Sequence, residues 1–189
     1  QVTFDTDLVL RYGVRCVRQF DMTLGGRYTP PLAQFAFEDE GVGPTRDEEA
    51  RLDTLAAHVH RHGELGSRKL LAMDVEGAEW ASLWSCPGTV LASFDHVVLE
   101  LHGLSDLRSM RHRAAVLAKL NLFFVVVHVH ANNFGLDQHD AMRCKFEDVL
   151  GYKVPTTLEV SFVNKRLVPS MACVAPSKRR LPCRLDQPN

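Results

Sequence analysis

The sequence predicts an α/β fold in which a mostly parallel sheet is covered by helices on both faces. Two observations carry this prediction: short apolar runs that suit strands alternate with segments of helical periodicity, and polar residues follow the ends of the apolar runs. The chain has 189 residues, 46% of them hydrophobic and 24% charged, which suits one globular domain. We assign this domain to residues 1–176 and a basic, loosely ordered tail to residues 177–189.

The first part of the chain is expected to contain two helices and two strands. Apolar residues recur at helical spacing over residues 4–12, and Gly13 suits the end of that helix. Apolar runs at residues 14–20 and 35–37 suit strands. Residues 47–62 form an amphipathic pattern, which predicts the second helix.

The second part of the chain is expected to alternate between strand and helix before it ends on a strand. Short apolar or β-branched runs predict the strands, and spacing of three and four residues between apolar positions predicts the helices. The predicted strands cover residues 70–73, 96–101, 123–130 and 157–163, and the predicted helices cover residues 76–84 and 106–120.

Composition and cysteine spacing exclude several classes of protein. The formal net charge of -1 does not favour a nucleic-acid partner. No apolar run in the sequence is long enough to span a bilayer, so no membrane segment is expected. The five cysteines include no C-x-x-C pair, which argues against a zinc ribbon or a thioredoxin-type site. Cys16 lies in an apolar run and is interpreted as a buried small side chain.

Acidic residues follow two of the predicted strands. Asp74 ends the strand at residues 70–73, and Glu76 and Glu79 follow within one turn. Ligands of open α/β sheets bind outside the carboxyl ends of the strands, which favours a functional site at Asp74. The alternative is that acids near a helix N-terminus only complement the helix dipole. Asp21 ends an earlier strand, where it either binds ribose hydroxyls or forms an ordinary turn.

The histidines allow functional and structural interpretations. His102 follows a predicted strand, where it either acts as a general base or holds a loop. His128 and His130 alternate on one strand face. They could bind a metal, but packing or hydrogen bonding is the preferred interpretation. A further three, at positions 58, 60 and 62 near a helix end, are interpreted as solvated.

Four motifs in order resemble the methyltransferase domain of the FkbM-like group, a set of class I S-adenosylmethionine-dependent enzymes. They are DVEGAEW at residues 74–80, VVLELHG at 97–103, HVHANNFG at 128–135 and LEVSFV at 158–163. The resemblance covers nearly the whole chain. It implies a Rossmann-like sheet of seven strands in the order 3-2-1-4-5-7-6, with the last strand antiparallel.

The resemblance also implies an activity and roles for four residues. The expected reaction is methyl transfer from S-adenosylmethionine to a hydroxyl oxygen of a sugar or other small-molecule acceptor. Asp21 matches the acid that binds the cofactor ribose, and Asp74 matches the acid beside the reacting methyl group. Asp74 is expected to position cofactor or acceptor, Glu76 to assist, and His102 to take the proton. No metal ligand is expected.

The sequence departs from the family pattern at its start. The chain opens with Gln1 and enters an amphipathic segment almost at once, without the strand and glycine-rich turn that cradle the methionine part of the cofactor. We therefore expect an N-terminally incomplete domain that lacks its first, central strand and binds S-adenosylmethionine weakly or not at all. Without that strand, its neighbours would stand roughly 9 to 10 Å apart and would not pair.

Two other classes of function are compatible with the residues. The first is a binding module or relic that kept the sheet and lost the cofactor loop. The second is a metal-dependent hydrolase that uses Asp74, Glu76, His128 and His130. The second is less favoured, because the expected strand order places one strand between His102 and His130, so that these two histidines cannot share one zinc ion.

Overall fold

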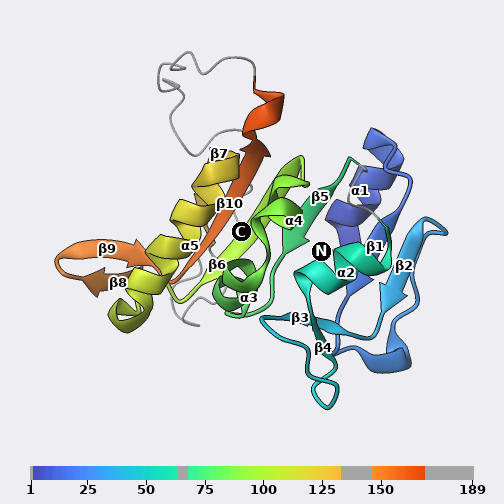
Figure 1. Ribbon diagram of the computed structural model, residues 1–189, viewed down its shortest axis with the longest axis horizontal. Helices are drawn as coiled ribbons and strands as arrows, with labels where there is room; N and C mark the ends of the chain where they lie inside the picture. The colour runs from blue at the N-terminus through green and yellow to red at the C-terminus, as the bar shows by residue number, and fades with distance from the viewer. Residues whose placement is uncertain (1, 64–67, 133–145, 169–189) are drawn as a thin grey trace, which may run out of the picture.

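The computed structural model describes residues 2–63, 68–132 and 146–168, and within them the chain has a mixed α/β fold (Figure 1). The main sheet contains β5 (Leu70–Met73), β6 (His96–His102), β7 (Phe124–Ala131) and β10 (Thr157–Asn164). Its order is β5-β6-β10-β7. β5 is parallel to β6, and β10 is antiparallel to both β6 and β7. Three strands therefore run in one direction, and β10 runs against them.

A smaller parallel pair lies beside the main sheet. It joins β1 (Val17–Phe20) to β2 (Phe35–Glu38), after the helix α1 (Val2–Tyr12). Gly13 has a φ of 69° at the end of α1, a backbone conformation that glycine adopts without strain. Within the described residues β1 pairs only with β2, and β5 pairs only with β6. The prediction that β1 and β5 are not direct partners is confirmed.

The prediction of one helix over residues 47–62 is wrong. β3 (Gly41–Gly43) pairs in parallel with β4 (Leu52–Thr54), and α2 (Leu55–Arg61) begins only after them. The reason is local capping: the Thr54 side chain accepts a hydrogen bond from the backbone of Ala57, which satisfies a free amide of the first helical turn.

The helix predicted at residues 76–84 begins later, as α3 (Glu79–Ser85). Glu76 and Gly77 have φ values of 52° and 105°, so the chain turns through the left-handed region before the helix begins. Proline 87 separates α3 from α4 (Gly88–Ala92).

The remaining elements include a hairpin, formed by β8 (Phe146–Val149) and β9 (Tyr152–Pro155), that the strand pattern did not predict. The predicted helix at 106–120 begins as a short 3-10 turn, η2 (Leu107–Ser109), that the Asp106 side chain caps, and it continues as α5. The predicted tail, residues 177–189, and Asn133 lie outside the described residues. The other bounds are η1 (Gly25–Arg27), α5 (Met110–Phe123) and η3 (Lys165–Leu167).

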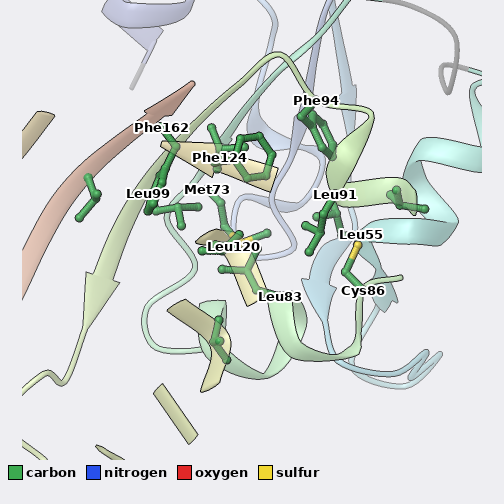
Figure 2. Packing of buried hydrophobic residues seen from close by; sticks show 14 of the residues in the cluster. Leu55, Met73, Leu83, Cys86, Leu91, Phe94, Leu99, Leu120, Phe124 and Phe162 are labelled. Atoms are coloured by element: carbon green, nitrogen blue, oxygen red, sulfur yellow. The ribbon is translucent and has the colours of Figure 1, made fainter. Parts of the chain in front are cut away.

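The hydrophobic core lies on one face of β6 and β10, under α2, α3, α4 and α5 (Figure 2). Leu83, Leu99, Leu120 and Phe124 are fully buried there. Along β6 buried residues alternate with half-buried ones, so the opposite face carries more polar positions such as Glu100 and His102. The sequence predicts helices on both faces of the sheet. In the described part of the chain, the core helices cover one face of β6 and β10.

The two described cysteines differ sharply in environment. Cys86 is buried in the core, and burial raises the pKa of its thiol to about 11. Cys16 is exposed, so the prediction that it is buried is wrong. It lies in the loop between α1 and β1, before the strand begins.

This difference predicts selective alkylation. Since the thiolate is the reactive form, iodoacetamide at mildly alkaline pH should modify Cys86 at least about 100-fold more slowly than Cys16 in the folded chain. Peptide mass spectrometry measures both rates in one sample, and the same reaction in urea is the control, where the two rates should converge. Equal rates in the folded chain would contradict the burial of Cys86.

Candidate functional site

Polar side chains from β5, β6 and α3 meet at one edge of the main sheet. Asp74 directly follows β5, whose last residue Met73 pairs with Leu99 of β6. Glu100 and His102 are the next residues of β6 on its more polar face. Because β5 and β6 are parallel, their carboxyl ends lie at the same edge, and Asp74 comes beside Glu100 and His102.

The His102 imidazole lies at the centre of this cluster. Its Nδ1 is 2.9 Å from Oε1 of Glu79. Its Nε2 is 3.9 Å from Oδ1 of Asp74, 3.5 Å from Oε2 of Glu76 and 3.4 Å from Oε1 of Glu100. One ring nitrogen therefore contacts a single carboxylate, and the other faces three.

Glu79 is completely buried and fixes the orientation of His102. Its Oε1 accepts hydrogen bonds from the backbone amides of Val75 (3.0 Å) and Gly77 (3.1 Å), which closes the turn after β5. A carboxylate oxygen that already accepts two amide hydrogen bonds acts as an acceptor for the ring as well, so Nδ1 of His102 donates to it and Nε2 is directed away from Glu79. Oε2 of Glu79 has no hydrogen-bond partner within the described part of the chain.

Trp80 holds the backbone of the same histidine. Its indole Nε1 donates to the carbonyl oxygen of His102 at 2.9 Å. The Arg113 guanidinium lies over the Trp80 ring, 5.5 Å from its centroid, and forms an ion pair with Asp106. Consecutive residues at the start of α3 thus contact the side chain and the main chain of His102, so its position depends on α3 as well as on β6.

The cluster carries excess negative charge. Burial raises the pKa of Asp74, with His102 lowering it and the carboxylates of Glu76 and Glu79 raising it further. Burial also raises the pKa of Glu100, as does the nearby Asp74. Among the described residues, no lysine or arginine forms an ion pair with any of these four carboxylates.

The structure brings three of the predicted site residues together. Asp74, Glu76 and His102 lie within one cluster. Asp21 has a different environment: its Oδ1 accepts hydrogen bonds from the backbone and side chain of Thr23, which is an ordinary aspartate turn. α3, which follows β5, contacts β3, which follows β2. The segments of the chain after β5 and after β2 therefore lie in the same region. That Asp21 and Asp74 contact the same cofactor, as the resemblance implies, stays a prediction.

Sequence reasoning missed the role of Glu79, which it explained by the helix dipole alone. A glutamate at the first residue of a helix can reach back to free amides of the preceding turn, and Gly77 marks that turn. Asn132 was also missed as a partner: its side chain donates to Oε1 of Glu100 at 2.8 Å. Asn132 lies at the end of β7, far from Glu100 in sequence, so no local pattern indicated the contact.

The other histidines lie elsewhere. The rings of His128 and His130 stack on β7 with centroids 6.2 Å apart. As predicted, β10 lies between them and His102. The prediction that the helix histidines are solvated is wrong for His58, which is buried with Nε2 3.2 Å from the carbonyl oxygen of Gly41.

A second cluster of charged residues lies beside the helix α2. α2 packs against the acidic end of β2, where Glu38, Glu40, His58 and Arg61 meet. Arg61 forms ion pairs with both glutamates, and it also binds the buried carboxylate of Asp53. An arginine therefore already pairs with the carboxylates of this second cluster.

No family model, curated protein or solved structure matches the chain. In the part of the chain that the structure describes, no helix is both long and apolar enough to cross a membrane.

The buried contacts of Glu79 predict a large stability difference between two neighbouring glutamates. Glu79→Ala leaves two backbone amides and the His102 ring without their acceptor, so it should lower the free energy of unfolding by about 3 kcal/mol or more. Glu76→Ala is the matched control. The Glu76 side chain is 86% exposed, so its removal should cost less than about 0.5 kcal/mol.

Urea denaturation followed by circular dichroism measures both changes. Loss of less than about 1 kcal/mol on Glu79→Ala would contradict the assigned hydrogen bonds.

Proposed function

We propose that this chain belongs to a class I S-adenosylmethionine-dependent methyltransferase that acts on a hydroxyl of a sugar or another small molecule. One observation carries the proposal: acidic residues and a histidine cluster at the carboxyl ends of β5 and β6, in a sheet of order β5-β6-β10-β7 with β10 reversed. The resemblance implies this same order for the fourth, fifth, seventh and sixth strands of the family.

The residues at hand fit part of the cofactor. S-adenosylmethionine, when bound, supplies an activated methyl group. Asp21 would hold the ribose: the turn with Thr23 fixes its carboxylate through Oδ1, and Oδ2 makes no hydrogen bond within the described residues. Asp74 would lie beside the methyl group and the acceptor. β1 and β5 are not paired with each other, so a pocket built from these residues would be loosely preorganised, and binding is expected to be weak.

The cluster around His102 supplies the proton acceptor. Methyl transfer to a hydroxyl requires alignment of the oxygen and a group that takes its proton. Nε2 of His102 and the carboxylates of Asp74 and Glu76 all lie at one point of the sheet edge. Glu79 and Trp80 position the imidazole from behind and leave Nε2 toward the acceptor side.

Cofactor binding is the first test. Saturation-transfer difference NMR detects weak ligands, and ribose and adenine protons of S-adenosylmethionine should receive saturation from the folded chain. Asp21→Ala should remove most of this transfer, because a carboxylate contact to two hydroxyls is worth about 1.5 to 3 kcal/mol. Asp39→Ala, an exposed aspartate between β2 and β3, is the matched control and should leave the transfer unchanged.

Absence of transfer to a folded chain would contradict cofactor binding by the chain as it stands. An unchanged signal in Asp21→Ala would refute the assignment of the ribose site.

Turnover is the second test. With methyl-labelled S-adenosylmethionine and a panel of sugars, His102→Gln should lower kcat by about 100-fold to 10,000-fold, the usual contribution of proton transfer. The variant should bind the cofactor as the wild type does, since His102 faces the acceptor. A variant with wild-type kcat would exclude His102 from the reaction.

A further inference from the structure

The three carboxylates that face Nε2 of His102 create an electrostatic problem. Nδ1 donates a hydrogen bond to Glu79, so Nε2 points toward oxygens of Asp74, Glu76 and Glu100. Nε2 makes no hydrogen bond within the described residues, although Glu100 is only 3.4 Å away. Three carboxylates around one ring nitrogen repel one another unless a cation lies among them.

The positions of these atoms match a metal site. One oxygen of Asp74, one oxygen of Glu100 and one ring nitrogen of His102 all lie within 4.8 Å of one another. Ligands at about 2.1 Å from a first-row divalent ion are separated by about 3 to 4 Å, depending on the angle at the metal. Nε2 is 3.9 Å from the Asp74 oxygen and 3.4 Å from the Glu100 oxygen, so these three atoms need only small movements to share an ion.

The surroundings of the triad resemble those of bound metals. A histidine that ligates a metal usually donates its other N–H to a carboxylate, which fixes the ring and increases its basicity. Glu79 provides that carboxylate, fully buried, and its Oε2 is a buried oxygen with no partner in the described residues. Asn132 donates to Glu100 in the same way and orients this second ligand. Hydrogen bonds with Glu79 and Asn132 therefore hold His102 and Glu100 in place.

We infer that Asp74, Glu100 and His102 bind one divalent transition-metal ion, with Nε2 of His102 and one oxygen of each carboxylate as ligands. One imidazole and two carboxylates suit Mn²⁺, Zn²⁺ or Co²⁺ better than Ca²⁺, which prefers oxygen ligands alone. This inference replaces the expectation that the chain has no metal ligand. It also differs from the hydrolase alternative, because its histidine is His102 rather than His128 or His130.

The second acidic cluster of the chain does not compete for this role. Glu38, Glu40 and His58 also bring three ligand atoms together. Arg61, however, forms ion pairs with both glutamates, so an ion there would have to displace an arginine. The His102 cluster has no such cation among the described residues.

The metal site extends the proposed function and does not depend on it. In the metal-bound state Nε2 of His102 would be a ligand, so Glu76 would replace His102 as the group that takes the proton in the proposed reaction. An acceptor hydroxyl bound to the ion would lose its proton more readily. Metal binding is measured on the chain itself, so a failure of methyl transfer leaves the metal site to be judged separately.

Electron paramagnetic resonance of Mn²⁺ tests the site on the whole chain. The signal of free Mn²⁺ should fall on binding of one equivalent of ion. Glu100→Gln keeps the contact with Asn132 and removes the charge, and it should weaken binding at least about tenfold. Glu159→Gln is the matched control. Glu159 is exposed on β10, where it pairs directly with Glu100 of β6, and it does not belong to the triad. Its substitution should weaken binding less than about threefold.

His102→Gln separates a metal site from simple attraction of cations. It changes no carboxylate, yet it should weaken Mn²⁺ binding at least about tenfold and remove the preference for Mn²⁺ over Ca²⁺. Circular dichroism confirms that each variant is folded, and Asp74→Asn provides a second ligand variant if His102→Gln does not fold. A folded wild-type chain that leaves millimolar Mn²⁺ free, or equal binding in wild type and all ligand variants, would overturn the inference.

Discussion

The buried carboxylate of Glu79 is the constraint on which the rest of the site depends. One of its oxygens closes the turn after β5 through two backbone amides and also accepts a hydrogen bond from His102 Nδ1. A single group therefore sets where α3 begins, which ring nitrogen of His102 is free, and how close β5 and β6 bring their polar ends. Burying this charge costs free energy, and these three hydrogen bonds offset the cost.

The strand β6 connects the core to the site by simple alternation. Val97, Leu99 and Leu101 are buried under the helices, and the residues between them lie on the opposite face. A shift of register by one residue would exchange the two faces, so the same packing that buries the leucines presents Glu100 and His102 at the sheet edge. The register that buries the apolar face of β6 therefore also places the charged residues of the site on its opposite face.

The sequence was most informative where the pattern is local. The apolar run before Asp74 and the β-branched strand β7 are recognisable because strand-forming residues follow one another along the chain, although each strand has one buried residue in the structure. The helix predicted at 47–62 failed because Thr54 caps a shorter helix, and apolar spacing alone does not reveal a cap that ends a strand. The role of Glu79 depends on His102, 23 residues further along the chain, and such a contact leaves no local signature.

The protonation state of the His102 ring is the most direct measurement of this account. Long-range ¹H–¹⁵N correlation NMR distinguishes a ring nitrogen that carries a proton from one that carries a lone pair. Without added metal, Nδ1 should carry the proton that Glu79 accepts, and on Zn²⁺ addition the Nε2 resonance alone should shift to a metal-bound position. A lone pair on Nδ1 with the proton on Nε2 would contradict both the role of Glu79 and the metal site that depends on it.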